Sequence, residues 1–322
     1  PSGSARESIF TMNSNTLPDW SRDELRTTQS TPDWFNEAVA WPMHSGFVTV
    51  DECRIHYLRW ESPPSIEARG NGLLFVHGGG AHANWWRFIA PQLANSYVCA
   101  AIDLSGMGDS GRRETYDATQ RSAEMQAVIE AAGLGPRAVV VGHSFGGYMT
   151  MRLAAHHGSE LGGVVIVDSP IRTDDDEEAA TPRRAINLAR HYPSFDIGVE
   201  RFRLMPVQSC ANEFLVEFIA RHSLRETESG WTWKFDVGAM GSRRWEEPFA
   251  EHCANMSCRQ ALIYGQHSAL VSPRTVAHMR GLMDPSTPVI EIPDAQHHIM
   301  LDQPLAFVSA LRSILAGWSD QR

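Results

Sequence analysis

Short, fully apolar runs recur along this chain and constrain its fold more than any other feature of the sequence. Each run has the length of one buried strand, and most of them are separated by stretches with helical periodicity. Strands that alternate with helices imply right-handed crossover connections and a mostly parallel sheet. The sequence therefore predicts an α/β fold, with strands at 73–76, 98–102, 138–141, 164–167, 261–264 and 289–292 and helices at 84–95, 117–132, 145–157, 273–282 and 304–317.

Two regions depart from this alternation. Residues 46–60 alternate apolar and polar side chains on both sides of Asp51 and Glu52, which is typical of a β-hairpin. The interval 169–259 has no equally clear strand, contains an acidic cluster near its start and is rich in aromatic residues. Such an insertion at one end of a parallel sheet predicts a mainly helical cap over a pocket. Extra core without a role in recognition is the alternative.

These patterns divide the 322 residues into three parts. Residues 1–45 are expected to be a cloning remnant, at 1–11, followed by a polar N-terminal arm. Residues 46–170 and 251–322 form the predicted α/β core, and residues 171–250 form the predicted cap.

The charge and the cysteines limit the partners of the chain. A net charge of −10 disfavours nucleic acid and anionic membrane surfaces, which select for basic patches. No apolar run reaches the length of about 18 residues that a membrane span needs. We expect a cytoplasmic protein that does not insert into membranes, and a homodimer is left open. Free thiols in a reducing compartment are favoured over a zinc site, because no C-x-x-C spacing occurs among Cys53, Cys99, Cys210, Cys253 and Cys258.

The residues 142–146 read Gly-His-Ser-Phe-Gly and fit the pattern G-x-S-x-G. They directly follow a predicted strand and directly precede a predicted helix, which is the context in which the central serine acts as a nucleophile. A nucleophile on so sharp a turn needs small residues two positions away on each side, and Gly142 and Gly146 supply them. We expect Ser144 to be a nucleophile; the alternative is a small residue in a glycine-rich turn.

A second glycine-rich stretch, His-Gly-Gly-Gly at 77–80, follows the first apolar run. Glycines tolerate unusual backbone angles, so N–H groups in such a loop can turn toward a developing oxyanion. We expect the N–H groups of Gly79 and Phe145 to form this oxyanion hole. A plain tight turn is the alternative.

With these motifs the chain resembles the α/β-hydrolase fold superfamily, over roughly residues 46–170 and 255–322. The residues 103–110 are similar to the D-x-x-G-x-G-x-S loop of that family, and 294–304 resemble its catalytic-histidine loop. The resemblance implies a mostly parallel, eight-stranded-type sheet flanked by helices. It also implies that nucleophile, acid and base follow one another in this order along the chain.

The family pattern places the catalytic base seven residues before the proline that opens the last helix. Counting back from Pro304 gives His297, although Gln296 takes the place of the usual glycine. The adjacent His298 is the second candidate for the base, and otherwise it is a pocket wall or packing residue.

The acid has several candidates. In many relatives it follows the strand after the cap in a Gly-x-x-Asp pattern, but this chain has Ser268 there, and a serine cannot stabilise an imidazolium as a carboxylate does. Branches that resemble certain haloalkane dehalogenases and lactone hydrolases carry the acid after the preceding strand, where this chain has Asp168. We expect Asp168 to be the acid. The alternatives are that Asp168 caps the following segment, or that Asp294 or Asp302 is the acid.

Together, Ser144, Asp168 and His297 predict a serine hydrolase that cleaves a carboxylic ester or lactone through an acyl-enzyme, without metal or organic cofactor. Thioesters, amides and carbon–carbon bonds are alternative targets of the same fold. A receptor-like, ligand-binding protein without turnover is an alternative of another class, favoured by the absence of an acid at 268. An apolar or aromatic small-molecule substrate is expected from the predicted pocket residues His82, Trp85, Trp231, Trp233 and His298.

Overall fold

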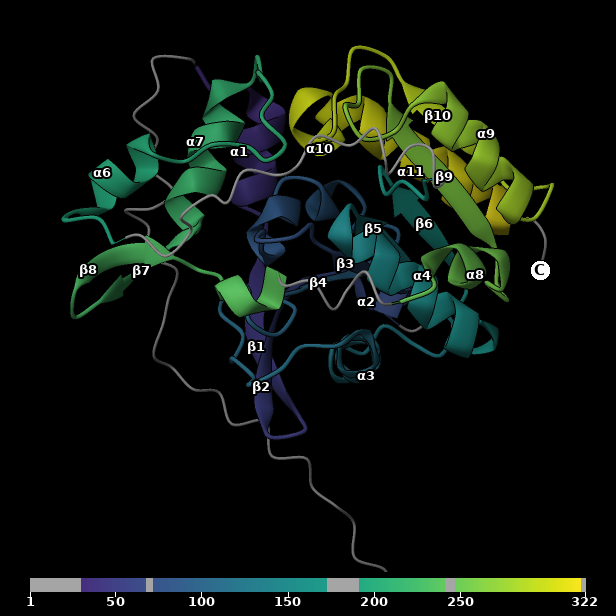
Figure 1. Ribbon diagram of the computed structural model, residues 1–322, viewed down its shortest axis with the longest axis horizontal. Helices are drawn as coiled ribbons and strands as arrows, with labels where there is room; N and C mark the ends of the chain where they lie inside the picture. The colour runs from purple at the N-terminus through teal and green to yellow at the C-terminus, as the bar shows by residue number, and fades with distance from the viewer. Residues whose placement is uncertain (1–29, 68–71, 173–190, 241–246, 320–322) are drawn as a thin grey trace, which may run out of the picture.

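An eight-stranded sheet runs through the computed structural model, which describes residues 30–67, 72–172, 191–240 and 247–319 (Figure 1). The strand order is β1-β2-β4-β3-β5-β6-β9-β10. The β1–β2 and β2–β4 pairs are antiparallel and all other neighbours in the sheet are parallel. This arrangement confirms the predicted fold class. The strands are β1 (Met43–Val50), β2 (Cys53–Trp60), β3 (Gly72–Val76), β4 (Val98–Ile102), β5 (Val139–His143), β6 (Gly163–Val167), β9 (Gln260–Gly265) and β10 (Val289–Ile292).

The central strands are apolar throughout because helices cover both faces of the sheet. Successive side chains of a strand point to opposite faces, so Leu73 and Phe75 join one hydrophobic cluster while Leu74 and Val76 join the other. The first cluster includes side chains of α1 (Asp33–Val39), α7 (Glu213–His222), α10 (Ile299–Asp302) and α11 (Pro304–Ser319). The second includes side chains of α3 (Ala118–Ala131), α4 (Phe145–His157), α8 (Phe249–Ala254) and α9 (Pro273–Leu282).

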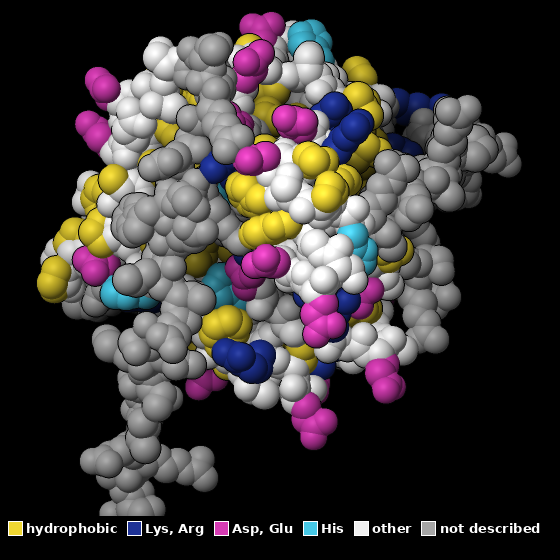
Figure 2. All heavy atoms as spheres, turned by 90° about the vertical axis from the view of Figure 1, so that its left-hand side faces the viewer, with side chains coloured by type: hydrophobic (Ala, Val, Ile, Leu, Met, Phe, Trp, Pro, Cys, Tyr) yellow, Lys and Arg dark blue, Asp and Glu magenta, His cyan; other side chains and the backbone are white. Residues whose placement is uncertain are grey.

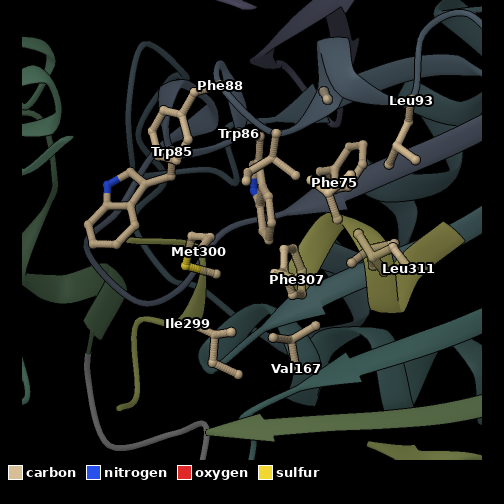
Figure 3. Close-up of a cluster of buried hydrophobic side chains, with 14 of the residues drawn as sticks. Phe75, Trp85, Trp86, Phe88, Leu93, Val167, Ile299, Met300, Phe307 and Leu311 are labelled. Carbon is tan, nitrogen blue, oxygen red and sulfur yellow. The ribbon is translucent and has the colours of Figure 1, made fainter. Parts of the chain in front are cut away.

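Trp86 is a central side chain of the first cluster (Figure 3). Its ring centroid lies 5.1 Å from that of Phe75 on β3 and 6.2 Å from that of Phe307 on α11. Burial of Phe75 and Phe307 contributes about 1.5–3 kcal/mol each to the stability of the fold. The helix predicted at 84–95 is wrong: this stretch forms two 3₁₀ turns, η2 (Ala83–Trp86) and η3 (Ala90–Gln92). Pro91 explains the break, since it has no N–H with which to continue a helix.

The N-terminal arm predicted within 1–45 is wrong for its last part. The helix α1 lies there, with Phe35 and Ala38 buried in the first cluster, and β1 already begins at Met43. These two buried positions are three residues apart, which places them on one face of a short helix. The remnant and the arm up to residue 29 lie outside the described residues.

The chain between β6 and β9 contains both helices and strands. Before α8 it forms α6 (Phe195–Glu200), α7 and an antiparallel hairpin of β7 (Leu224–Thr227) and β8 (Gly230–Trp233). The sequence did not predict this hairpin, because strands of four residues give little alternation to recognise. The acidic cluster at 174–178 lies outside the described residues.

All five cysteines are free thiols. Among the described residues, no helix combines the length and the apolar character that crossing a membrane requires.

Candidate active site

Ser144 stands on a sharp turn between β5 and α4. Its backbone angles are φ 52° and ψ −116°, a left-handed conformation that costs about 1–3 kcal/mol in a residue with a side chain. Two hydrogen bonds hold it: the Ser144 N–H donates to the Val167 carbonyl at 2.9 Å, and the Ser169 hydroxyl donates to the Ser144 carbonyl at 2.8 Å. The Ser144 hydroxyl makes no capping bond to α4 and faces His297 instead.

The glycines around Ser144 are required by close backbone contacts. A Cβ at Gly142 would lie 2.6 Å from the Gly146 carbonyl oxygen, and a Cβ at Gly146 would lie 2.6 Å from the Val76 carbonyl oxygen. Carbon and oxygen atoms cannot approach so closely, so α4 reaches this position only with glycine at both sites. This packing is the physical reason for the G-x-S-x-G pattern.

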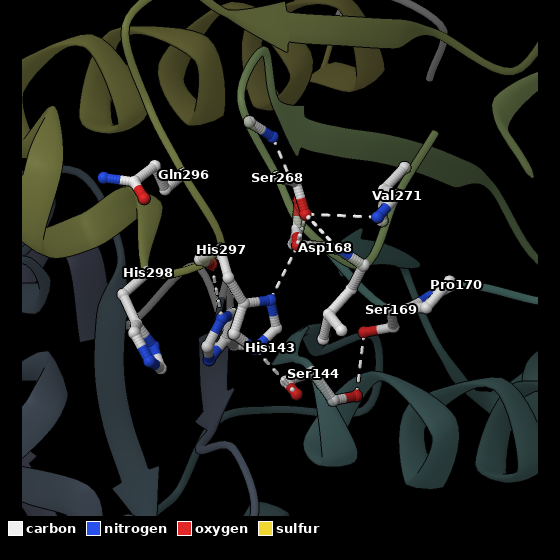
Figure 4. A network of polar contacts seen from close by, with 12 residues as sticks. His143, Ser144, Asp168, Ser169, Pro170, Ser268, Val271, Gln296, His297 and His298 are labelled. Atoms are coloured by element: carbon white, nitrogen blue, oxygen red, sulfur yellow. Dashed lines mark hydrogen bonds and ion pairs between the residues drawn. The ribbon is translucent and has the colours of Figure 1, made fainter. Parts of the chain in front are cut away.

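Ser144, His297 and Asp168 form one chain of hydrogen bonds (Figure 4). The His297 Nε2 atom lies 3.0 Å from Ser144 Oγ, and its Nδ1 donates to Asp168 Oδ2 at 2.7 Å. His297 comes from the loop between β10 and α10, and Asp168 directly follows β6. Both side chains are buried, so their hydrogen bond forms away from water. The structure thus brings together the three residues that the sequence selected.

Asp168 accepts two further hydrogen bonds from the C-terminal end of β9 and the loop that follows it. The Gly265 N–H donates to its Oδ1 at 3.0 Å and the Ser268 hydroxyl donates to its Oδ2 at 2.6 Å. A buried carboxylate is stable only when it is well hydrogen-bonded. Ser268 occupies the position of the acid in the Gly-x-x-Asp pattern of many relatives, and here its hydroxyl donates to the carboxylate of Asp168. We did not predict this role from the sequence, although the Gly-x-x-Ser pattern at 265–268 indicates it.

Gly265 also allows the His297 loop to cross β9. A Cβ at Gly265 would lie 2.6 Å from the Ala295 carbonyl oxygen. Because β10 is separated from β6 by β9, His297 reaches Asp168 only where its loop passes closely over this glycine.

The other candidate acids have different contacts. Asp294 is exposed and its Oδ1 lies 3.9 Å from His267. Asp302 accepts from the Gln296 N–H at 2.7 Å and from the Gln208 side chain at 2.9 Å, and burial raises its pKa. Both ring nitrogens of His297 are engaged by Asp168 and Ser144, so neither alternative carboxylate takes the place of Asp168.

The glycine loop after β3 lies directly against the nucleophile. A Cβ at Gly78 would be 3.5 Å from Ser144 Cβ and 3.1 Å from His143 Nδ1. Gly79 follows on this loop, and Phe145 is the first residue of α4.

His77 fixes the geometry of the glycine loop. Its Nε2 accepts from the Leu104 N–H at 3.1 Å, so its Nδ1 carries the proton and donates to the Gly78 carbonyl at 2.7 Å. Burial lowers the pKa of His77, which keeps the ring in this neutral form.

Two more histidine rings pack beside His297. The ring centroid of His143 lies 4.7 Å and that of His298 lies 4.8 Å from His297, and the two lie 5.6 Å from each other. Burial, followed by the neighbouring His297, lowers the pKa of both His143 and His298 well below the ordinary range. His143 Nε2 donates to the His297 carbonyl at 3.0 Å.

His298 is buried, and among the described residues neither of its ring nitrogens has a hydrogen-bond partner. The Met205 backbone acts to raise the pKa of His298, but the contact does not meet hydrogen-bonding geometry. Trp85 packs against it, with ring centroids 5.1 Å apart. His82 is also buried, and its Nε2 lies 2.9 Å from the Ser223 hydroxyl.

The predicted pocket tryptophans lie in two different places. Trp85 points away from the core side chain Trp86 (Figure 3), and its ring packs against that of His298. Trp231 packs on Phe195, and Trp233 packs on Tyr192 and Phe202, which are all residues of the inserted segment. Figure 1 shows their strand β8 at the edge of the molecule, away from the strand ends that carry Ser144 and Asp168.

Known proteins resemble this chain over most of its length. The model of the alpha/beta hydrolase family matches residues 73–311. This chain belongs to the alpha/beta hydrolase family. An esterase of Mycobacterium tuberculosis, Rv0045c, is 26% identical over 276 residues, which cover 81% of this hydrolase and 86% of the relative. A pimeloyl-[acyl-carrier protein] methyl ester esterase of Edwardsiella ictaluri is 27% identical over 258 residues, which cover 77% of this hydrolase and 94% of the relative.

Solved structures show the same fold at lower identity. The structure of E-2-(acetamidomethylene)succinate hydrolase superimposes with a TM-score of 0.71 at 18% identity, over 85% of this hydrolase and 100% of that chain. The structure of Rv0045c superimposes with a TM-score of 0.64 at 22% identity, over 89% and 99% of the two chains.

Proposed function

We propose that this alpha/beta hydrolase is a serine esterase that cleaves a carboxylic ester or lactone of a small apolar or aromatic molecule through an acyl-enzyme. The observation that carries the proposal is the hydrogen-bonded chain from Ser144 through His297 to Asp168, with distances of 3.0 and 2.7 Å. Serine, histidine and a buried carboxylate in this order form the arrangement that activates a hydroxyl for acyl transfer.

The first half of the reaction forms the acyl-enzyme. His297 Nε2 accepts the Ser144 proton as Oγ bonds to the substrate carbonyl carbon, and the carbonyl electron pair moves onto oxygen. When the tetrahedral intermediate collapses, the bond to the leaving alkoxide breaks and His297 returns the proton to it. Asp168 holds Nδ1 and stabilises the imidazolium between these steps.

The second half releases the acid. Water adds to the acyl carbon while His297 takes its proton, and the bond to Ser144 Oγ breaks as His297 reprotonates that oxygen. We assign the oxyanion in both halves to the N–H groups of Gly79 and Phe145. Removing one such donor typically costs about 10²–10³-fold in kcat. The mechanism requires neither a metal nor an organic cofactor.

We further propose that the inserted segment acts as a cap. It is bonded to both sides of the site: His82 after the glycine loop contacts Ser223, and the His298 N–H donates to the Gln208 side chain at 3.1 Å. The Arg87 guanidinium donates to His222 at 3.2 Å on the same side as His82. These contacts support a cap that closes over Ser144 and limits access of water.

The substrate class rests on the surroundings of Ser144. Trp85 and His298 present aromatic surface beside His297, and burial keeps His298 uncharged, which favours an apolar acyl group. The face that bears α6, α7 and the hairpin exposes hydrophobic side chains among acidic ones (Figure 2). Large exposed hydrophobic residues of the inserted segment are Ile197, Met205, Val207 and Val237. Such a surface suits an uncharged substrate better than an anionic one.

The two full-length relatives support an ester over a thioester, an amide or a carbon–carbon bond, since both are named as ester hydrolases. The receptor-like alternative depended on the missing acid at 268. With Asp168 bonded to His297, the arrangement has the carboxylate that turnover needs.

A fluorophosphonate probe tests the proposal. We expect one adduct per chain, mapped by peptide mass to Ser144, and none in Ser144→Ala. The matched control is Ser309→Ala, which removes an exposed serine of α11 and should label like the wild type. A panel of acyl esters and lactones then defines the substrate. A folded wild-type protein that neither labels nor hydrolyses any member would favour the ligand-binding alternative.

A further inference from the structure

Three imidazole rings meet at the site, and the proposed reaction uses only one of them. His143, His297 and His298 each offer a ligand atom, and these three atoms lie within 4.8 Å of one another. All three side chains are buried. A cluster of three histidines with this spacing has the composition of a transition-metal site.

His298 is the side chain that fold and reaction leave unexplained. Within the part of the chain that the structure describes, neither of its buried ring nitrogens has a hydrogen-bond partner, and the residue is only 4% exposed. A buried polar group without a partner costs about 1–3 kcal/mol. The cost would be offset if these nitrogens had another ligand.

The other two rings are oriented as metal ligands usually are. A ligating histidine typically donates its second N–H to a carboxylate or a carbonyl, which fixes the tautomer. His297 Nδ1 donates to Asp168, and His143 Nε2 donates to the His297 carbonyl. Each ring therefore keeps its other nitrogen, Nε2 of His297 and Nδ1 of His143, with a lone pair.

The described chain contains a second cluster of possible metal ligands, but hydrogen bonds within the protein already occupy its histidine. It consists of His56, Asp103 and Asp109. His56 Nδ1 lies 2.7 Å from Asp103 Oδ2 and its Nε2 lies 2.8 Å from the Ser45 hydroxyl. Both nitrogens are thus occupied, which distinguishes this group from the one around His298.

We propose that His143, His297 and His298 form a site for a transition-metal dication such as Zn²⁺, and that occupation of this site inhibits the enzyme. The inference rests on the proposed function, because it assigns His297 the role of base. A metal bound to His297 Nε2 takes the lone pair that would accept the Ser144 proton. The cation is an inhibitor here and not a cofactor, and its removal by a chelator restores activity.

The geometry requires only small movements. Zn–N bonds of about 2.0–2.1 Å in a tetrahedral site place ligand nitrogens roughly 3.3 Å apart. The ligand nitrogens, which now lie within 4.8 Å of one another, must therefore approach by at most about 1.5 Å, and His298 can turn without breaking a side-chain hydrogen bond within the described chain. Ser144, whose Oγ lies 3.0 Å from His297 Nε2, is only partly buried.

The ligand set predicts selectivity. Neutral imidazole nitrogens suit Zn²⁺, Cu²⁺ and Ni²⁺, whereas Mg²⁺ and Ca²⁺ prefer oxygen ligands. The carboxylate of Asp168 is already bonded to His297, Ser268 and Gly265. We expect Mg²⁺ at the same concentration to leave the enzyme active.

Metal binding is measured directly on the full chain by calorimetry with Zn²⁺ and by the visible absorption of bound Co²⁺. We expect one equivalent in the wild type and in Ser144→Ala, which keeps all three rings. His298→Phe should weaken Zn²⁺ binding about tenfold or more, since loss even of a residue that only supports a ligand commonly costs 10–100-fold, and His298 is proposed as a ligand itself. The matched control is His156→Phe, which removes an exposed histidine near His252 and should bind like the wild type.

Inhibition is measured as loss of fluorophosphonate labelling and of ester hydrolysis on adding Zn²⁺, with recovery on adding a chelator. Binding that depends on His298 and blocks labelling supports the inference. Hydrolysis that continues at saturating Zn²⁺, or binding that follows His156 instead, overturns it and leaves the proposed function intact. Binding that depends on His298 in a chain without labelling or hydrolysis would remove the proposed function and keep the metal site.

A crystallographic measurement covers the case in which His298→Phe does not fold. Crystals of the wild-type chain are soaked in Zn²⁺ and the anomalous signal is located. A peak between the rings of His143, His297 and His298 supports the inference, and zinc found only elsewhere overturns it.

Discussion

The two ring nitrogens of His297 face surroundings that differ in how their polar atoms are satisfied. On the Nδ1 side, Asp168 accepts hydrogen bonds from His297, Ser268 and Gly265. On the Nε2 side, Ser144 is the partner at 3.0 Å, and the adjacent His298 has two nitrogens without partners. A buried charge must be fully hydrogen-bonded, whereas a neutral imidazole tolerates packing alone. The hydrogen bonds of Asp168 therefore hold the acid in one position, whereas ring nitrogens on the nucleophile side can still bind another partner.

The acid side is itself shared between two strands. The residue after β6 supplies the carboxylate, and two of its donors come from the last residue of β9 and the loop that follows it. Ser268 thus contributes a hydrogen-bond donor to the acid Asp168, whereas a carboxylate at position 268 would itself be the acid. Four predictions test this comparison.

Asp168→Asn should have the largest effect. An amide cannot stabilise the imidazolium and favours the wrong tautomer of His297, so kcat should fall about 10²–10⁴-fold. The measurement is kcat for the best ester of the panel. Asp294→Asn, which changes an exposed carboxylate on the His297 loop, is the control and should keep wild-type activity. Activity close to wild type in Asp168→Asn would remove Asp168 from the mechanism.

Moving the carboxylate should recover part of this loss. Ser268 Oγ lies 2.6 Å from the Asp168 oxygen that binds His297, so a carboxylate at 268 comes within reach of that ring. Adding Ser268→Asp to Asp168→Asn should raise kcat roughly 10–100-fold, as expected for a charge-assisted hydrogen bond worth about 1.5–3 kcal/mol. Ser272→Asp in the same background is the control. If both double variants match the single variant, the two strand ends are not interchangeable.

Low pH should lower the stability of the protein through the buried histidines on the nucleophile side rather than through the surroundings of Asp168. The folded-state pKa values of His82, His143 and His298 lie well below their unfolded values, with burial as the main cause. The unfolded chain therefore binds more protons below about pH 6.5, and stability is complete above that pH and falls as pH decreases toward the folded pKa values. Each histidine contributes a slope of about 1.4 kcal/mol per pH unit.

Denaturant unfolding between about pH 7.5 and pH 5 measures this slope. His298→Phe should flatten the dependence by the contribution of one histidine, and the exposed control His267→Gln should not. Equal slopes in the wild type and His298→Phe would contradict the assignment of His298 as a buried neutral ring.

Ser268→Ala should have the smallest effect. The variant removes one donor to Asp168 and leaves the Gly265 N–H and His297 in place. A hydrogen bond worth about 0.5–1.5 kcal/mol corresponds to a roughly 2–10-fold lower kcat, with KM unchanged. Ser272→Ala is the control: it removes the N-cap of α9 and should lower stability by about 1 kcal/mol while activity per folded molecule stays the same. A changed KM with unchanged kcat in Ser268→Ala would instead indicate a substrate contact.

Local sequence patterns were sufficient to predict the parallel strands and two of the helices. The helices predicted at 145–157 and 273–282 have these same bounds in the structure, and the predicted parallel strands all occur. The prediction was wrong at 84–95 and for the arm within 1–45, and it missed the hairpin of β7 and β8. Pro91 breaks the helix at 84–95, and the burial of Phe35 explains why α1 forms within 1–45. Each depends on one residue rather than on a periodic pattern that could be recognised in the sequence.

The sequence by itself determined the α/β class and the turn that holds Ser144, because periodicity and glycine spacing act between residues that are neighbours along the chain. It selected His297 and Asp168 only with the help of a family resemblance. The tertiary structure decided which carboxylate meets the base: Asp168 and His297 are 129 residues apart and touch because the strand order brings β6, β9 and β10 side by side. It also decided the support from Ser268 and the unpaired nitrogens of His298, since burial and hydrogen bonding depend on every element packed around a side chain.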